Sequence, residues 1–144
     1  MKKEEYSKQI AARYPDHILG IEAIRPRRVT IDISPDIIRD IAGYLYSELK
    51  FRFIIASALH TRAGIEIHYH FSHDPSGFIY NIHTILDPNQ AEIDSLSSLF
   101  SGADWIEREM HEILGIVFRG HPKLEKLISE GNWAEGVYPY RKEY

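Results

Sequence analysis

The sequence predicts an α+β domain with helices on one face of an antiparallel or mixed sheet of about five strands, followed by a C-terminal helical and irregular docking segment. Three observations carry this prediction. Residues 18–33 and 52–86 contain alternating or uniformly apolar segments, as strands do. Residues 3–14 and 34–49 place apolar side chains three and four positions apart, as helices do. The connections within 52–86 are too short for parallel crossovers.

Length and composition indicate one soluble domain. At 144 residues, with 44% hydrophobic and 26% charged residues, the chain can bury a core without disulfides or a structural metal ion. We expect a single domain over residues 1–144, made of an α+β core (1–103) and a segment with a helix, a turn and a docking tail (104–144). No apolar run approaches the roughly 20 residues that a membrane-spanning helix needs.

Charge and cysteine content exclude several classes of function. A formal net charge of −4 argues against nucleic-acid binding through a general attraction to phosphate. The absence of cysteine excludes thiolate-held iron–sulfur clusters, a cysteine nucleophile and a thiolate zinc site. The start of the chain is charged and lacks the apolar stretch of a secretory signal, so we expect a cytoplasmic location.

The first elements are a helix and two strands. Residues 3–14 predict a short amphipathic helix with a thin apolar stripe, which stops before Pro15. Residues 18–24 and 29–33 have strand patterns, and a basic turn around Pro26 joins them. These segments open the predicted sheet.

The next helix has a strong start signal. The Ser34 oxygen can accept a hydrogen bond from a free backbone amide, Pro35 suits the first turn, and Asp36 favours the positive end of the helix. The helix should run to about Leu49. The residues expected on its inward face are Ile37, Ile38, Ile41, Leu45 and Leu49.

Three strands and two helices complete the prediction. Residues 52–61, 65–71 and 78–86 read as strands of an antiparallel meander, because turn residues separate them closely. A helix is expected over 91–100. Asp104 is expected to cap the helix that follows.

The histidines invite a metal-site interpretation. His68 and His70 are two residues apart on a predicted strand and point to one face, His73 follows near the turn, and His60 is on the neighbouring strand. No carboxylate or cysteine at a diagnostic spacing completes a ligand set. We therefore favour a solvent-facing strand surface, to which His83 also belongs, over a metal site.

The acidic helix after residue 104 offers no clear catalytic group. Glu107, Glu109 and Glu112 could act as general acids or bases, but Asp104 and Glu112 are each four residues from Arg108, a spacing that favours ion pairs on a solvated helix face. Trp105 and part of Glu109 are expected to face outward. The chain contains none of the glycine-rich or serine motifs of hydrolases, phosphate-binding loops or dinucleotide sites, so no catalytic residue is predicted.

The last third is irregular, aromatic and basic near its end. Glycines and prolines interrupt it, while its large side chains include Tyr138 and Tyr140 and its cations include Arg141 and Lys142. Tyrosine, tryptophan and arginine are preferred anchors in protein interfaces, so the segment is typical of a tail that docks on a partner. A tail folded back over its own sheet explains the composition equally well.

The same segment resembles a known family. The likeness is carried by Trp105-x-Glu107-Arg108-Glu109, Gly115-Ile116-x-Phe118-x-Gly120-His121-Pro122-x-Leu124 and Tyr138-Pro139-x-Arg141-Lys142. This ordered motif is similar to that of the small hydrophilic C subunit of respiratory complex I (NADH dehydrogenase) and of its relatives in membrane-bound energy-converting nickel–iron hydrogenases. At Glu112, Glu125 and Lys126 the chain looks more like the hydrogenase branch.

The resemblance implies a cofactor-free accessory subunit in the peripheral arm of a complex I-like NADH:quinone oxidoreductase or an energy-converting hydrogenase. Its partners would be the large catalytic subunit and the small iron–sulfur subunit, at the inner face of the cell membrane, where it would support electron transfer coupled to ion translocation. The residues that the resemblance and the composition assign to docking are Trp105, Glu107, Arg108, Glu109, Gly120, His121, Pro122, Tyr138, Arg141 and Lys142.

Two alternatives stay open at this stage. One is a metal-dependent enzyme that uses His60, His68, His70 and His73. The other is a self-associating module that pairs through a sheet edge or its aromatic tail.

Overall fold

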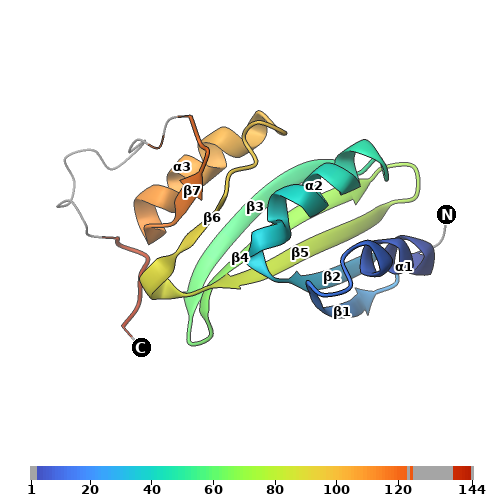
Figure 1. The fold of residues 1–144 in the computed structure, drawn as a ribbon, viewed down its shortest axis with the longest axis horizontal. Helices are drawn as coiled ribbons and strands as arrows, with labels where there is room; N and C mark the ends of the chain where they lie inside the picture. The colour runs from blue at the N-terminus through green and yellow to red at the C-terminus, as the bar shows by residue number, and fades with distance from the viewer. Residues whose placement is uncertain (1–2, 123, 125–137, 144) are drawn as a thin grey trace.

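The computed structural model describes residues 3–122, 124 and 138–143. A central mixed sheet of five strands carries helices along one of its faces (Figure 1). The elements in chain order are α1 (Lys3–Arg13), β1 (Ile18–Arg25), β2 (Arg28–Ile33), the 3-10 turn η1 (Pro35–Ile37), α2 (Ile38–Ser47), β3 (Arg52–Thr61), β4 (Gly64–His73), β5 (Phe78–Leu86), η2 (Pro88–Gln90), β6 (Glu92–Asp94), α3 (Gly102–Leu114) and β7 (Val117–Arg119).

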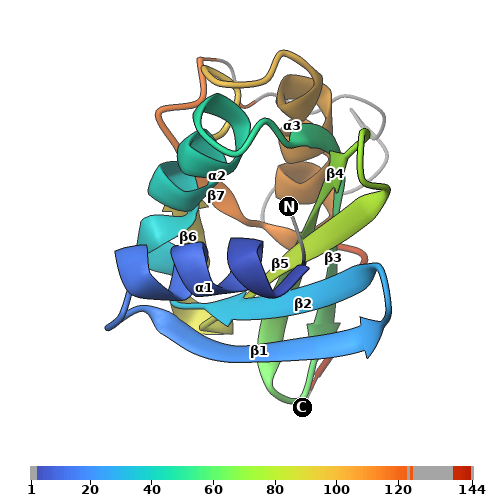
Figure 2. The ribbon, with the colours of Figure 1, turned by 90° about the vertical axis from the view of Figure 1, so that its right-hand side faces the viewer.

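The sheet has the strand order β1-β2-β5-β4-β3. The chain leaves β2 through α2, returns as β3 at the far edge, and makes two hairpins that bring β5 beside β2 (Figure 2). β2 and β5 are consequently parallel, whereas the other neighbouring strands are antiparallel. The predicted α+β class and the antiparallel meander are confirmed.

The face of the sheet toward the helices, here called the inner face, is apolar. On β4, Ile65, Ile67, Tyr69 and Phe71 are each at most 1% exposed. They share one buried cluster with the residues predicted for the inward face of the helix over 34–49, all of which are buried. Alternation along the strands and the spacing in α2 therefore located this core correctly.

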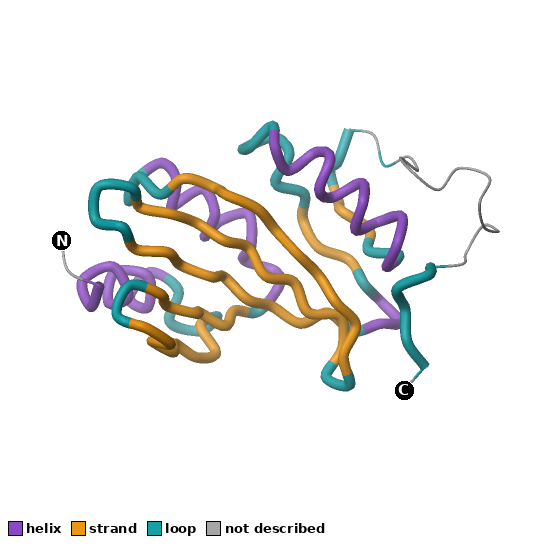
Figure 3. The backbone as a smooth tube through the Cα atoms, turned by 180° about the vertical axis from the view of Figure 1, so that it is seen from behind, coloured by secondary structure: helices purple, strands orange, loops and turns teal. Residues whose placement is uncertain are grey.

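The opposite face is here called the outer face. No helix in the described residues covers it, and Figure 3 shows its strands unobstructed. Alternation and strand register place on it Thr30 and Asp32 of β2, Ile55, Ser57 and Leu59 of β3, Glu66, His68 and His70 of β4, and Asn81, His83 and Ile85 of β5.

The start of α2 differs from the prediction. Ser34 makes no capping hydrogen bond with its side chain, and the chain enters α2 through the 3-10 turn η1. The Ser34 hydroxyl donates to Asp36 Oδ1 at 2.5 Å instead, because a hydrogen bond to a charged carboxylate is stronger than one between neutral groups.

The predicted helix over 91–100 is wrong. Residues Glu92–Asp94 form β6, which pairs with β7 in a two-stranded parallel sheet. Ile93, Leu96 and Phe100 are buried, and their spacing of three and four residues imitates a helix. Pairing with a distant strand, which local spacing does not encode, gives β6 its backbone hydrogen bonds.

The predicted cap of the following helix is also wrong. α3 begins at Gly102 with Ser101 in the N-cap position, so Asp104 lies in the first helical turn. An aspartate in that turn is still favoured by the positive helix end.

Candidate functional site

The motif helix α3 has an acidic residue inside its buried face. Ala103, Glu107, Met110 and Leu114 follow one another along this face, and the side chain of Glu107 is only 1% exposed. Glu112 is equally buried. The expectation that Glu107 and Glu112 belong to a solvated helix face is therefore wrong.

The opposite side of α3 agrees with the prediction. Trp105 is 55% exposed, and Glu109 is exposed one turn later. The Arg108 guanidinium carbon lies 6.0 Å from the centroid of the Trp105 ring. Arg108 is half-buried, and its Nε is buried without a hydrogen-bond partner among the described residues.

Glu107 ties α3 to the segment that follows β6. Its carboxylate accepts a hydrogen bond from the Ser95 hydroxyl at 2.6 Å and one from the Leu96 backbone amide at 2.7 Å. Burial raises the pKa of Glu107, and the two hydrogen bonds, which favour the charged form, oppose part of this shift. Glu107 is thus an internal acceptor that holds two segments together.

His121 makes a second connection to the same helix. Gly120 adopts a positive φ of 83°, which turns the chain after β7 back toward α3. The His121 side chain is fully buried, and its Nε2 lies 3.2 Å from the backbone oxygen and 3.1 Å from Oδ1 of Asp104. Its neighbour Pro122 is exposed.

Residues 138–143, here called the C-terminal strap, lie against the end of α3. The Arg141 guanidinium donates to the backbone oxygens of Leu114 at 2.5 Å and Pro88 at 2.8 Å. The Tyr140 amide donates to the Ile113 oxygen at 3.0 Å. The final carbonyls of a helix lack partners within the helix, so Arg141 and Tyr140 supply them.

The strap also reaches the sheet. The Lys142 amide donates to His60 Nδ1 at 2.9 Å, and burial lowers the pKa of His60, with Arg141 and Lys142 adding to the shift. For residues 138–143 these contacts support a tail folded over its own domain. The predicted tail between residues 125 and 137, and Tyr144, lie outside the described residues.

The ten predicted docking residues divide by their exposure. The exposed ones are Trp105, Glu109, Gly120, Pro122 and Lys142. Those engaged with the chain itself are Glu107, His121 and Arg141, together with Tyr138 on Gly115 and the half-buried Arg108 beside Trp105. Docking stays a prediction for all ten. Tyr140, which is 63% exposed, was not among them although its position in an aromatic tail was a usable signal.

The four histidines of the metal-dependent alternative do not meet. His68 and His70 are on the outer face, whereas the register of β3 and β4 places His60 on the inner face. His73 is on the inner face too, where it contacts Tyr6 and Ser76. Two of the four histidines lie on each face of the sheet. The predicted ligand set is therefore wrong.

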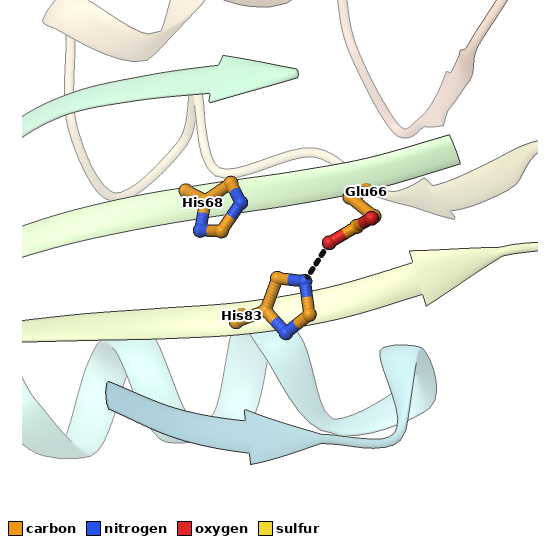
Figure 4. Close-up of side chains that lie close together, drawn as sticks. All are labelled: Glu66, His68 and His83. Atoms are coloured by element: carbon orange, nitrogen blue, oxygen red, sulfur yellow. Dashed lines mark hydrogen bonds and ion pairs between the residues drawn. The ribbon is translucent and has the colours of Figure 1, made fainter. Parts of the chain in front are cut away.

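A different cluster forms on the outer face, as Figure 4 shows. His83 pairs with His68 across β4 and β5, and the two rings stack with centroids 4.5 Å apart. His83 Nε2 is 2.7 Å from Glu66 Oε1, and His83 Nδ1 is 2.6 Å from Asp32 Oδ1. The assignment of His83 to the polar face is confirmed.

The surroundings favour the charged form of Glu66 and the neutral form of His68. The Thr61 hydroxyl donates to Glu66 Oε2 at 2.6 Å and, with His83, lowers the pKa of Glu66. Burial lowers the pKa of His68, followed in size by the influence of His83. Sequence reasoning missed Glu66, although alternation along β4 places it on the same face as His68.

No described helix has the length and apolar character needed to cross a bilayer.

Residues 31–144 match the profile of a family described as "Respiratory-chain NADH dehydrogenase, 30 Kd subunit".

Two relatives extend the match over nearly the whole chain. The C subunit of F(420)H(2) dehydrogenase from Methanosarcina mazei is 28% identical over 140 residues, which cover 94% of this chain and 87% of the relative. The C subunit of NADH-quinone oxidoreductase from Roseiflexus sp. (strain RS-1) is 30% identical over 141 residues, which cover 94% and 79% of the two chains.

Solved structures share the fold. A chain from the structure of a membrane-bound sulfane sulfur reductase, described as an archaeal respiratory membrane complex, superposes with a TM-score of 0.81 at 26% identity, over 96% of this chain and 82% of that one. A trypsin-resistant fragment of Nqo5 has a TM-score of 0.71 at 19% identity, over 86% and 100%. The second likeness concerns the fold alone.

Proposed function

This chain belongs to the family of the 30 kDa subunit of respiratory-chain NADH dehydrogenase, and we propose that it is an accessory subunit of a complex I-like or related respiratory membrane complex. It contributes a docking surface and carries no redox group. The oxidoreductase activity belongs to the assembly, in which electron transfer is coupled to ion translocation, and the isolated chain has none.

The proposed partners are the large catalytic subunit and the small iron–sulfur subunit of the peripheral arm. The chain would sit at the cytoplasmic, inner face of the cell membrane and be held there through these partners. An NADH:quinone oxidoreductase and an energy-converting hydrogenase are both assemblies of this type.

The proposal rests on two exposed aromatic side chains whose backbone segments are held in place by internal hydrogen bonds. Trp105 is 55% exposed on α3, and Tyr140 is 63% exposed on the C-terminal strap. Glu107 and Arg141 anchor the two backbones that present them. Large aromatic residues on a backbone that is already held in place are favourable interface anchors, because less conformational entropy is lost on binding.

Co-expression with the large and iron–sulfur subunits from the same genome tests this docking surface. The wild-type chain should elute with them in size-exclusion chromatography. The double variant Trp105→Ala/Tyr140→Ala should bind at least about tenfold more weakly, the loss expected when interface anchors are truncated.

A matched control separates docking from general loss of apolar surface. Leu19→Ala removes a residue that is 70% exposed on β1, away from the motif segment, and should leave binding unchanged. Equal thermal stability of all variants would show that the fold is intact. Full binding by the double variant would place the interface elsewhere.

A further inference from the structure

The outer face of the sheet carries a convergent set of metal-ligand atoms. One oxygen of Glu66 and one ring nitrogen each of His68 and His83 lie within 4.8 Å of one another. They come from the adjacent strands β4 and β5 and face one another (Figure 4). Two imidazoles and one carboxylate, with a further coordination position left open, form a ligand set found in zinc proteins.

The groups behind these ligands orient them as a metal site requires. Asp32 Oδ1 lies 2.6 Å from Nδ1 of His83 and can accept a hydrogen bond from this nitrogen. The other ring nitrogen of His83, Nε2, is directed at Glu66. Histidines that bind metal ions usually donate their other N–H to a carboxylate or carbonyl in this manner. Thr61 holds the remaining oxygen of Glu66 at 2.6 Å.

His68 has a comparable partner in Asn81. The Asn81 amide group lies 3.0 Å from His68 Nδ1, while Asn81 Oδ1 is buried without a hydrogen-bond partner among the described residues. The oxygen and nitrogen of an amide are assigned from their surroundings. Turning this amide by 180° gives the Asn81 oxygen the Nδ1–H of His68 and leaves Nε2 of His68 bare.

Charge and access favour a divalent transition-metal ion over Mg²⁺ or Ca²⁺. The carboxylates of Glu66 and Asp32 offset a dication, while the imidazoles select zinc-like ions rather than ions that need only oxygen ligands. The side chains of Glu66 and His83 are 20% and 14% exposed, so an ion can enter from solvent. In the metal-free chain, His83 Nε2 lies 2.7 Å from Glu66 Oε1, and the bound ion would replace this contact.

We propose that Glu66, His68 and His83 bind one Zn²⁺ ion on the outer face, with Asp32 orienting His83 and water completing the coordination. Zn²⁺ has no redox chemistry, so this site adds a bound metal ion to the proposed accessory subunit without adding an electron carrier. The site extends beyond the proposed function and does not depend on it.

Zinc titration of the purified chain tests the proposal. After dialysis, elemental analysis should find one zinc per chain, and competition with a chromophoric chelator should give its affinity. Glu66→Gln and His68→Gln should each weaken binding at least about tenfold, and Asp32→Asn about tenfold to a hundredfold. Zinc should raise the melting temperature of the wild type and not of His68→Gln.

His70→Gln is the matched control, because His70 is two residues from His68 on the same face but outside the ligand set. It should bind zinc as the wild type does. Failure of the wild type to take up stoichiometric zinc, or equal loss in His70→Gln and His68→Gln, would overturn the proposal. Melting curves without metal identify any variant that has failed to fold. If a ligand variant fails to fold, the zinc affinity of Asp32→Asn, which keeps all three ligands, tests the proposal instead.

Discussion

Glu107 shows how a charged residue in a motif can serve the fold. Its carboxylate lies between α3 and the segment after β6 and accepts hydrogen bonds from Ser95 and Leu96. A glutamate on the apolar face of a helix is tolerated only when such donors replace water. Exposed anchors such as Trp105 depend on this internal connection for their position.

Glu107→Leu should therefore destabilise the isolated chain. The substitution fills the space but leaves the buried Leu96 amide without its acceptor, so we expect a loss of about 2–3 kcal/mol in the free energy of unfolding. Urea denaturation measures it. The exposed neighbour Glu109 provides the control, since Glu109→Gln should change stability by about 0.5 kcal/mol or less. Similar losses in the two variants would contradict an internal role for Glu107.

The same carboxyl group gives stability a defined pH dependence. Burial raises the pKa of Glu107 in the folded chain above its ordinary value of 4.5, so the folded state holds this proton more tightly than the unfolded state does. Stability contributed by this group therefore falls as the pH rises from 4.5 through the raised folded pKa. The free energy of unfolding of the wild type, minus that of Glu107→Gln, should decrease over this interval in urea titrations. An increase would mean that the hydrogen bonds outweigh burial.

Gly115 allows the ring of Tyr138 in the C-terminal strap to approach the end of α3 closely. It ends α3 in the left-handed region with φ 74°, and a Cβ atom here would lie 2.7 Å from Cε2 of Tyr138. Gly115→Ala should cost about 1–2 kcal/mol from the backbone and the displaced ring. In a double-mutant cycle with Tyr138→Ala, the combined loss should be smaller than the sum. Additive losses would show that the ring does not press on this position.

At the scale of elements, the C-terminal strap completes α3. Arg141 reaches the end of the helix from a segment far away in the chain and connects it to η2 through the Pro88 oxygen. A cation at the C-terminal end of a helix is also favoured by the helix dipole. Strap and helix therefore form one unit, which presents Tyr140 and Trp105.

Arg141→Met should detach the strap without unfolding the sheet. Methionine keeps the apolar part of the side chain but cannot donate to the two carbonyls, so we expect a loss of about 1–2 kcal/mol. The amides of Tyr140 and Lys142 should exchange faster with deuterium in NMR experiments. Lys142→Met is the control, because the strap bond of Lys142 to His60 uses the backbone amide. Unchanged exchange in Arg141→Met would show that other contacts hold the strap.

The elements that could be predicted from sequence are those whose pattern is local. Alternation identified β2, β4 and β5, and spacing identified the buried side of α2. β6 escaped prediction because its partner β7 is distant in sequence, and its buried residues imitate a helix. In α3 the charge of Glu107 wrongly indicated a solvent-exposed position. Glu107 is buried because donors from another segment, such as the Leu96 amide, replace water around its carboxylate.

The outer-face cluster shows the same division. The hairpin from β4 to β5 brings His68 opposite His83, and alternation adds Glu66, so three of its members follow from local rules. Asp32 could not be predicted, because it joins through the parallel pairing of β2 with β5, which depends on the path of the chain through α2 and β3.

At the scale of the whole molecule, the chain has one covered and one open side. Helices cover the inner face of the sheet, while no helix among the described residues covers the outer face (Figure 3). Exposed Ile55, Leu59 and Ile85 lie on that open face. A subunit with such surfaces and family relatives in membrane-bound complexes is expected to function in contact with other chains.

Purification of the tagged chain from membranes of its own cell tests the proposed role as an accessory subunit most directly. We expect the large catalytic subunit and the iron–sulfur subunit to co-purify in equal amounts with the chain, and all iron–sulfur absorbance to remain with those partners when the chain is dissociated from them. Recovery of the chain alone, or of a redox group bound to the dissociated chain, would contradict an accessory role.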